Sequence, residues 1–330
     1  MPSGIKLKAT LHEVEGDAMR VFISGDRGMV GSSVRRMMAD LPEFDVLGVS
    51  RSDLDLTDQT AVRRYFESER PDAIVFAAAR VGGIFANRTY PAEFLYANAA
   101  MAVNCIHFAW QCGVTRFLYL GSTCIYPRLA SQPVSEDSLL TGPLEETNEA
   151  YAIAKILGVK LCSFYRRQYG VRYHSIMPTN LYGPGDNYHP ENSHVIPGLL
   201  SRFHDAVENG SQEVVVWGSG SPLREFLFVD DLASAIVHAL RMEEPPDVMN
   251  AGSGEEVSIA ELAQLCGDIV GFKGRISFDR EKPDGTPRKL ADSSRLKESG
   301  WKPSFSLTEG LRLAYDSFLE ERSGNRLRIC

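Results

Sequence analysis

The chain has 330 residues, of which 44% are apolar, so it can bury a large core in one domain or two cooperating lobes. Its formal net charge of -8 argues against general affinity for nucleic acid or anionic membranes, and no apolar stretch is long and uncharged enough to span a bilayer. Residues 1–18 have no signal-peptide character, so we expect a polar extension and assign it no function.

The cysteines indicate a reducing, cytoplasmic environment. No CxxC pair and no histidine at metal-ligand spacing is found beside Cys105, Cys112, Cys124, Cys162, Cys266 and Cys330. We therefore predict no metal site, and we interpret every cysteine except Cys124 as a small core or surface residue.

The first element predicted is a strand that leads into a glycine loop. Residues 19–24 form a short apolar run, and Gly25, Gly28 and Gly31 follow it before residues 32–38, whose apolar positions have helical spacing. Strand, loop and helix in this order are typical of a dinucleotide site, because the backbone approaches the pyrophosphate and the helix N-terminus favours an anion. The spacing is GxxGxxG rather than the commoner GxGxxG, so the loop alone is weak evidence.

The end of the second strand, predicted at residues 44–49, favours NADP over NAD. Many NAD sites place an acidic residue there to bind the ribose, whereas NADP sites use positive charge for the extra phosphate. Here Arg51 follows the strand, and Arg27 lies inside the glycine loop. The alternative is a pair of solvated arginines.

The next segments alternate between strand and helix. We predict strands at residues 72–79, 116–120 and 173–177, and long helices at about 92–112 and 149–169. This alternation predicts an α/β fold of the Rossmann type, a doubly wound parallel sheet whose ligands lie at the carboxyl ends of the strands.

Beyond residue 178 the composition shifts toward Gly, Pro, Asn and His, with turn signals at residues 182–186 and 218–222. We therefore predict a nucleotide-binding domain over residues 19–180 and a smaller substrate-binding lobe over residues 181–330. Residues 226–231 and 248–252 resemble strands that return to the main sheet, so the two lobes are expected to interleave.

Tyr151 and Lys155 are the most informative pair in the chain. Residues four apart share one face of a helix, so the Lys155 ammonium can lie beside the Tyr151 phenol and lower the pKa of that phenol toward neutrality. Such a phenol can exchange a proton with a sugar hydroxyl or ketone. A Tyr and a Lys at this spacing also occur on ordinary surface helices, but here Ser122 ends the strand upstream and a glycine loop precedes both.

The glycine loop, Ser122 and the Tyr-x-x-x-Lys spacing together resemble the extended short-chain dehydrogenase/reductase superfamily. Five further segments resemble its GDP-L-fucose synthase family from about Met19 nearly to the C-terminus. They are GSTCIYP at residues 121–127, MPTNLYGP at 177–184, NSHVIP at 192–197, REFL at 224–227 and PDGTPRK at 283–289. Thr123 stands where the family often has Ser, which keeps a hydroxyl.

This resemblance implies NADPH-dependent 3,5-epimerisation and 4-reduction of GDP-4-keto-6-deoxy-D-mannose to GDP-L-fucose. It implies that Cys124 and His194 exchange protons beside the ketone, and that Ser122 and Tyr151 bind the ketone oxygen while Lys155 orients the nicotinamide ribose. The substrate contacts it implies are Ser122, Asn180, Arg202, Trp217, Arg224 and Asp284. The NADP(H) contacts it implies are Gly25, Arg27, Gly28, Met29, Val30, Gly31, Arg51, Asp55, Leu56, Ala78, Leu120, Gly121, Lys155, Pro178, Asn180, Leu181 and His194.

Three alternatives stay open at this point. Relatives act on GDP-4-keto heptoses or dideoxy sugars, and nothing in the sequence measures the room beside C3 or C6 of the sugar. An NAD-retaining dehydratase or 4-epimerase is ranked lower, because Thr123 and Cys124 replace the acidic pair of a dehydratase. A non-catalytic NADP-binding scaffold is ranked lowest, because it would not need the five catalytic residues.

The prediction of the oligomeric state rests on two long helices, at about residues 92–112 and 149–169. These helices could form a four-helix contact between two copies, as is usual in the superfamily that the chain resembles. We therefore expect a homodimer, although packing within one chain would explain the same apolar stripes.

Overall fold

The computed structural model describes residues 18–82, 84–190, 192–282 and 284–329. The predicted N-terminal extension, apart from Ala18, lies outside the described residues, as does Cys330. No helix in these ranges is both long enough and apolar enough to cross a membrane.

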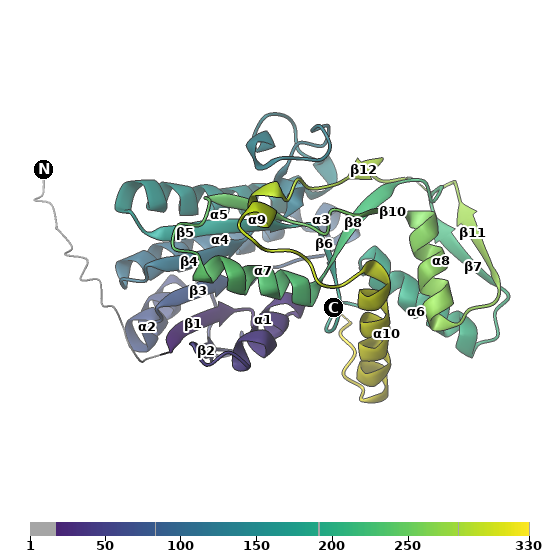
Figure 1. Cartoon of the computed structure of the whole chain (residues 1–330), viewed down its shortest axis with the longest axis horizontal. Coiled ribbons are helices and arrows are strands. Elements are labelled where there is room, and N and C mark those ends of the chain that lie inside the picture. Colours follow the sequence, from purple (N-terminus) through teal and green to yellow (C-terminus); the bar gives the residue numbers. More distant parts are fainter. Residues whose placement is uncertain (1–17, 83, 191, 283, 330) are drawn as a thin grey trace, which may run out of the picture.

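The main sheet has six strands, all parallel, in the order β2-β1-β3-β4-β5-β9 (Figure 1). The strands are β1 (Met19–Ser24), β2 (Phe44–Gly48), β3 (Ala73–Phe76), β4 (Arg116–Leu120), β5 (Arg172–Pro178) and β9 (Val248–Ala251). The order reverses between β1 and β3, which confirms the predicted doubly wound sheet.

Helices cover both faces of this sheet because alternate residues of each strand point to opposite faces. The helices of the nucleotide-binding half are α1 (Met29–Ala39), α2 (Gln59–Glu69), α3 (Ile84–Thr89), α4 (Pro91–Gln111), α5 (Glu149–Tyr169), α7 (Val229–Arg241) and α9 (Ser294–Glu298). In β1, Phe22 packs into one core with α2, α4 and α5, whereas Val21 and Ile23 pack into another with α1 and α7. Three short 3-10 turns are η1 (Thr123–Ile125), η2 (Glu136–Ser138) and η3 (Glu146–Asn148).

Local signals explain where several helices begin and end. The Asp58 carboxylate caps α2 by accepting from the Thr60 and Ala61 amides, and Gly170 ends α5 in the left-handed conformation at φ +72°. Two helices of the second lobe, α8 (Ile259–Val270) and α10 (Leu307–Ser323), begin with complete capping boxes.

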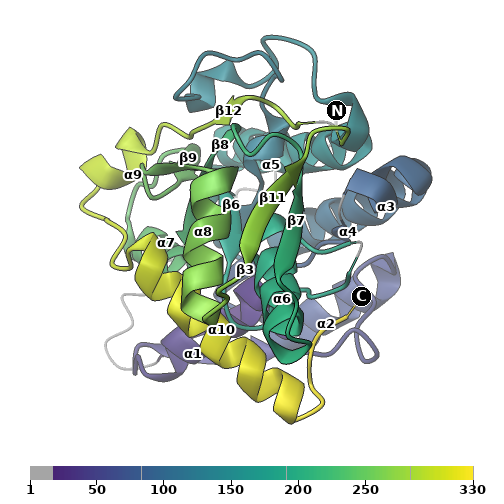
Figure 2. The same ribbon diagram turned by 90° about the vertical axis from the view of Figure 1, so that its right-hand side faces the viewer.

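The second lobe has its own core, formed by two small sheets and three helices (Figure 2). One sheet has the order β10-β8-β12, with β6 also paired to β8, and the other pairs β7 with β11. The strands are β6 (Asn180–Tyr182), β7 (Glu213–Trp217), β8 (Leu223–Phe228), β10 (Glu256–Ser258), β11 (Arg275–Asp279) and β12 (Arg288–Lys289). The third helix, α6 (Val195–Glu208), packs against α8.

The lobes interleave, but only one of the two predicted returning segments joins the main sheet. The segment near 248–252 does so, as β9 beside β5. The prediction for residues 226–231 was wrong: Phe226–Phe228 belong to β8 in the small sheet, and Val229 begins α7. A short run that is apolar throughout does not reveal which sheet it joins.

Candidate active site

The glycine loop turns tightly at the carboxyl end of β1. Gly25 has φ +74°, and its carbonyl accepts a hydrogen bond from the Gly28 amide at 2.9 Å. A Cβ on Gly31 would lie 2.1 Å from the Gly25 carbonyl oxygen, and a Cβ on Gly25 would lie 3.0 Å from the Ala78 Cα. The loop therefore brings bare backbone close to the end of β3 and directs the first amides of α1, from Met29 and Val30, toward this edge of the sheet.

Substitution of Gly31 by Ala is expected to weaken NADPH binding by about 10- to 100-fold, because the new methyl would clash with the main chain of Gly25 and Asp26 and force the loop to shift. Fluorescence titration of NADPH measures the affinity. Gly142→Ala is the matched control, because Gly142 is exposed and a Cβ there would meet only the side chain of Pro127, at 3.3 Å. Equal affinities for the two variants would contradict a tight phosphate-binding turn.

Arg27 and Arg51 are both exposed where the loops after β1 and β2 begin. Asp26 lies between these loops and is buried. Its carboxylate forms an ion pair with Arg35 at 3.2 Å, and one carboxylate oxygen would be 2.3 Å from a Cβ on Gly48. Asp26 was missed by the sequence analysis, which took only the positive charges there as informative.

The other residues of the predicted cofactor group lie at the same edge of the sheet. Asp55 accepts from the amide and hydroxyl of Thr57, which lower the pKa of its carboxyl, and the neighbouring Leu56 is buried. Pro178 ends β5, and Asn180 and Leu181 begin β6.

Ser122 and Cys124 follow β4 directly. The Ser122 hydroxyl oxygen accepts from the Cys124 amide at 3.2 Å and caps η1, so its own O–H remains available to a ligand. The preceding Gly121 amide bonds the Ile176 carbonyl at 2.9 Å, which joins the ends of β4 and β5. The turn therefore presents Ser122 and Cys124 at the carboxyl edge of the sheet.

Tyr151 and Lys155 lie on one face of α5, as their spacing predicts. The Lys155 ammonium is 5.8 Å from the Tyr151 ring centroid and 5.0 Å from that of Tyr119, and it donates to the Leu120 carbonyl at 2.7 Å. Only 3% of Lys155 is exposed, and burial lowers the pKa of its ammonium to about 7.

The predicted lowering of the Tyr151 pKa was wrong for the chain without ligands. Tyr151 keeps some solvent exposure, yet the protein around its phenol removes most of its hydration, and this burial raises its pKa. A negative charge on Cys124 would raise the pKa further, so the thiol lies within electrostatic reach of the phenol. Lys155 does not reverse the shift, because its own charge is destabilised by burial and its ammonium points to Leu120.

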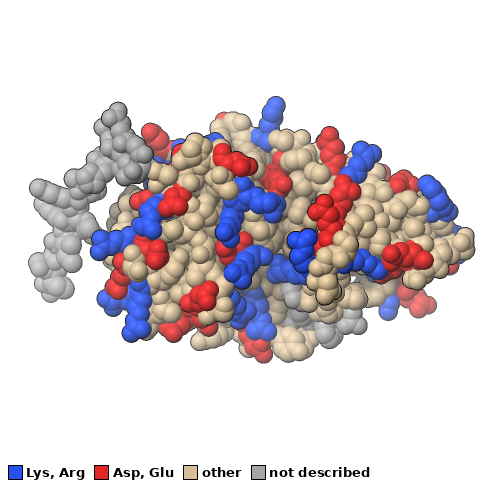
Figure 3. Space-filling view, turned by 90° about the horizontal axis from the view of Figure 1, so that it is seen from below, with Lys and Arg blue, Asp and Glu red and all other residues tan. Residues whose placement is uncertain are grey.

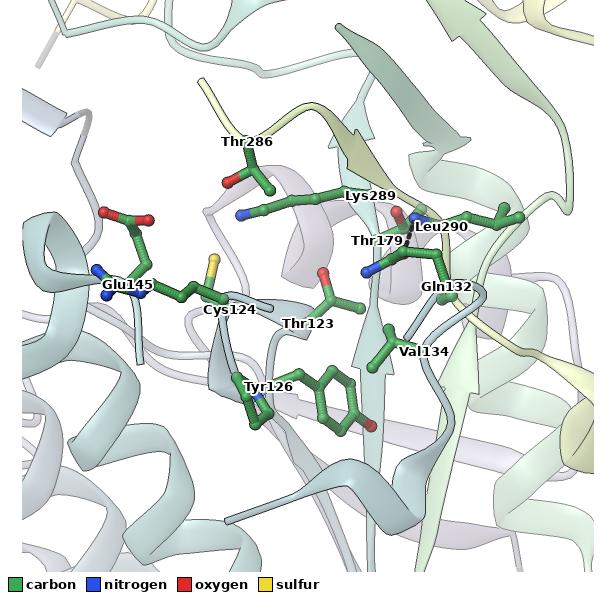
Figure 4. A pocket seen from close by; sticks show the side chains of 13 residues that line it. Thr123, Cys124, Tyr126, Gln132, Val134, Glu145, Thr179, Thr286, Lys289 and Leu290 are labelled. Atoms are coloured by element: carbon green, nitrogen blue, oxygen red, sulfur yellow. Dashed lines mark hydrogen bonds between the residues drawn. The ribbon is translucent and has the colours of Figure 1, made fainter. Parts of the chain in front are cut away.

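Cys124 opens onto a pocket between the two lobes, with an empty volume of about 490 Å³ including its mouth (Figure 4). Thr123, Thr179, Thr286 and Lys289 also line it, and the Lys289 side chain reaches across the pocket toward Cys124. The pocket therefore combines a thiol and three threonine hydroxyls with two cations, Lys289 and Arg128, and one carboxylate, Glu145.

Lys289 is a candidate residue that the sequence analysis missed. In the register of β12 and β8, Lys289 pairs with Arg224, so their side chains share one face of the small sheet. The signal was present in the segment PDGTPRK, from which only Asp284 was selected. The strand pairing that places Lys289 beside Arg224 joins residues 65 positions apart, so no short sequence pattern predicts it.

Two buried polar residues hold this pocket together. The Glu225 carboxylate accepts from the Gly254 amide at 2.7 Å and the Ala291 amide at 2.9 Å, which ties β8 to the segment after Lys289. The Asn250 amide side chain accepts from the Tyr126 hydroxyl at 2.6 Å and donates to the Val134 carbonyl at 3.0 Å, so β9 supports the pocket floor.

His194 caps the start of α6 and is not brought to Cys124 by any hydrogen bond between described residues. Its side chain is exposed, but the surrounding protein displaces much of its hydration and lowers the pKa of the imidazole. At neutral pH the imidazole is therefore mainly neutral, which allows it to accept a proton.

Four of the six predicted substrate contacts form two pairs in the second lobe. The Arg202 guanidinium lies 6.0 Å from the ring centroid of Trp217, whose side chain is 63% exposed. Asp284 accepts from the amide and hydroxyl of Ser219, at 2.8 and 2.6 Å, and its charge acts on Arg224. Burial lowers the pKa of both Arg202 and Arg224, so an anion beside them would relieve a desolvation cost.

The Asn180 side chain donates to the Glu225 backbone carbonyl at 2.8 Å. This hydrogen bond links Asn180 to β8, and not to Ser122 or Tyr151.

A model of the NAD dependent epimerase/dehydratase family matches residues 21–252. The chain belongs to this family. It is 53% identical to the GDP-L-fucose synthase of Escherichia coli K12 over 92% of the chain and 97% of that protein. It is 52% identical to GDP-L-fucose synthase 1 of Arabidopsis thaliana over 91% of the chain and 93% of that protein. These relatives confirm the resemblance predicted from the motifs.

Among solved structures, a GDP-L-fucose synthetase from Naegleria fowleri bound to NADP matches with a TM-score of 0.86 and 28% identity, over 94% of this chain and 97% of that chain. A GDP-D-glycero-L-gluco-heptose synthase from Campylobacter jejuni matches with a TM-score of 0.84 and 28% identity, over 92% of this chain and 98% of that chain. The fold is therefore shared by enzymes that act on different GDP sugars.

Proposed function

We propose that the chain is an NADPH-dependent 3,5-epimerase and 4-reductase that converts GDP-4-keto-6-deoxy-D-mannose to GDP-L-fucose. The observation that carries the proposal is Cys124 in the pocket between the lobes, two residues after Ser122 and within electrostatic reach of Tyr151. A reductase alone would need Ser122, Tyr151 and Lys155. A thiol at this position adds a base for proton exchange.

Proton exchange comes first in the proposed reaction. A ketone acidifies the protons on the carbons beside it, so the Cys124 thiolate can remove a proton from C3 or C5, and His194 can exchange a proton at the opposite face. The hydroxyls of Ser122 and Tyr151 donate to the carbonyl oxygen, where the negative charge of the enolate develops.

Reduction uses the same hydroxyls. NADPH, when bound, would supply the hydride for C4, and Tyr151 would give its proton to the ketone oxygen. In its ammonium form, Lys155 has two N–H donors beyond the one bonded to Leu120, and these can hold the nicotinamide ribose. Arg202, Arg224 and Lys289 supply positive charge for the diphosphate of the substrate, and Trp217 offers an exposed ring for packing.

Incubation with GDP-4-keto-6-deoxy-D-mannose and NADPH in deuterated water tests this function. We expect one NADPH oxidised per product, with deuterium at both C3 and C5. Turnover without net NADPH oxidation would indicate a dehydratase or 4-epimerase, and binding without turnover would indicate a scaffold. Faster turnover of a GDP-4-keto heptose or dideoxy sugar would change the substrate but not the chemistry.

Cofactor selectivity should depend on Arg51. Replacing it with Gln is expected to weaken NADPH binding by about 10-fold and to leave NADH binding unchanged, because only NADPH carries the 2′-phosphate. Binding of both cofactors to Arg51→Gln is compared with binding to Arg64→Gln, an exposed arginine on α2. Equal losses for both cofactors would contradict the assignment.

We also propose a cytoplasmic homodimer. The described cysteines are free thiols, as in a reducing compartment. The α4 and α5 helices pack against each other and still expose apolar side chains, including Tyr96 at 70% and Phe164 at 49%. A second copy could cover this surface. Light scattering should give twice the chain mass, and a monomer at micromolar concentration would contradict the proposal.

A further inference from the structure

The chain beyond α10 folds back toward the glycine loop (Figure 1). The Arg326 amide donates to the Glu321 carbonyl at 2.8 Å and reverses the chain, Leu327 packs against the core of the second lobe, and the Arg328 carbonyl accepts from the Tyr188 amide at 2.9 Å. The C-terminal segment, residues 325–329, is therefore fixed to the loop of residues 183–188.

That loop lies against the first turn of α1. A Cβ on Gly185 would be 3.8 Å from the Met29 Cα and 4.0 Å from the Ser32 hydroxyl oxygen. The Gly185 amide donates to the Glu321 carboxylate at 3.0 Å. The α10 helix, the loop and the start of α1 thus meet at one place.

The Arg328 guanidinium reaches the glycine loop itself. One of its terminal nitrogens lies 4.0 Å from the position of a Cβ on Gly28, the residue that caps α1 without a side chain. A space-filling view from below shows basic side chains gathered in the middle of this face, where α1 lies in Figure 1 (Figure 3). A cation at a helix N-terminus is repelled by the helix dipole, and an anion bound between them would be attracted by both.

A buried carboxyl accompanies this cation. Asp186 is 4% exposed, and one of its carboxylate oxygens has no hydrogen-bond partner among the described residues. Burial raises the pKa of Asp186 to about 7, while the charge of Arg328 opposes that rise and the charge of Glu321 adds to it. The Arg328 guanidinium therefore lies within electrostatic reach of a buried carboxyl that burial makes harder to ionise.

We propose that Arg328 is a cofactor-positioning residue. The C-terminal segment packs against the glycine loop, and the Arg328 guanidinium binds the diphosphate of the dinucleotide there. The inference rests on the proposed NADPH-dependent function. It adds a contact from the far end of the chain to a site that the sequence analysis built only from residues 25–194. The diphosphate is favoured over the 2′-phosphate, because Gly28 lies at the N-terminus of α1 and Arg51 follows β2.

The test compares Arg328→Gln with Arg326→Gln in the full chain. Arg326 is exposed in the same segment and serves as the matched control. We expect Arg328→Gln to raise the Kd of both NADPH and NADH by about 10-fold, with a weaker dependence on salt, and Arg326→Gln to change neither by more than about twofold. The kcat at saturating NADPH should stay near that of the unaltered chain, because Arg328 does not touch the reacting atoms.

A second variant separates cofactor binding from simple neutralisation of Asp186. If Arg328 only balances that carboxylate, Asp186→Asn combined with Arg328→Gln should restore NADPH affinity. The proposal expects the double variant to bind as weakly as Arg328→Gln, even where its melting temperature recovers.

Three results would overturn the inference: unchanged Kd in Arg328→Gln, restored affinity in the double variant, or a loss confined to NADPH, which would assign Arg328 to the 2′-phosphate. Failure of the unaltered chain to bind NADPH would instead refute the proposed function.

Discussion

Replacement of Tyr151 by Phe is expected to lower the rate of ketone reduction by about 100- to 10,000-fold, the range that a positioned proton donor contributes. Phe keeps the ring beside Lys155, so the fold and NADPH affinity should be retained. NADPH oxidation measures the effect. Tyr169→Phe is the control, because Tyr169 lies at the other end of α5 and is 43% exposed.

The pH dependence of this step follows from the direction of the Tyr151 shift. Burial raises the pKa of the phenol, so it stays protonated through the neutral range and is lost as a donor only at high pH. We therefore expect no fall in reduction rate from this group as the pH rises from about 6 to about 9. A Tyr151→Phe enzyme that oxidises NADPH at nearly the normal rate would remove Tyr151 from the mechanism.

Replacement of Cys124 by Ser is expected to slow deuterium incorporation at C3 and C5 by about 100- to 10,000-fold, because an alcohol is a far weaker acid than a thiol and supplies almost no anionic base near pH 7. Direct reduction should survive, giving a product reduced at C4 with C3 and C5 unchanged. Mass spectrometry and NMR of the product distinguish the two steps.

Cys112→Ser is the control for this experiment, since Cys112 lies after α4 and outside the pocket. Normal deuterium incorporation by Cys124→Ser would mean that another group is the base. Loss of incorporation and reduction together, with NADPH affinity intact, would mean that the thiol instead shapes the pocket for both steps.

The main sheet was predictable because each of its strands is an apolar run followed by a helix or turn signal. The observed β1 matches the predicted residues 19–24, and β4 matches 116–120. The segment at 226–231 was assigned to the wrong sheet, because the sequence of a short apolar strand does not distinguish pairing in the main sheet from pairing in the small sheet. Its partner β6 is chosen by packing between distant segments.

Helical spacing placed Tyr151 and Lys155 on one face, but it could not give the direction of the Tyr151 pKa shift. The direction of the shift depends on burial of the phenol and on the charge of Cys124, and both arise only when the turn after β4 packs against α5. Lys289 was missed for a similar reason, since its relation to Arg224 is set by strand register.

The position of β9 limits how this chain can be divided. Residues 248–251 complete the sheet beside β5, and α7 covers the face that α1 would otherwise expose. A fragment ending at residue 180 would leave an unpaired strand edge and an apolar surface, and we expect it to aggregate. A chimera that exchanges substrate specificity with a relative would have to retain residues 229–251 from the nucleotide-binding parent, so the transplanted region must be inserted in two pieces around them.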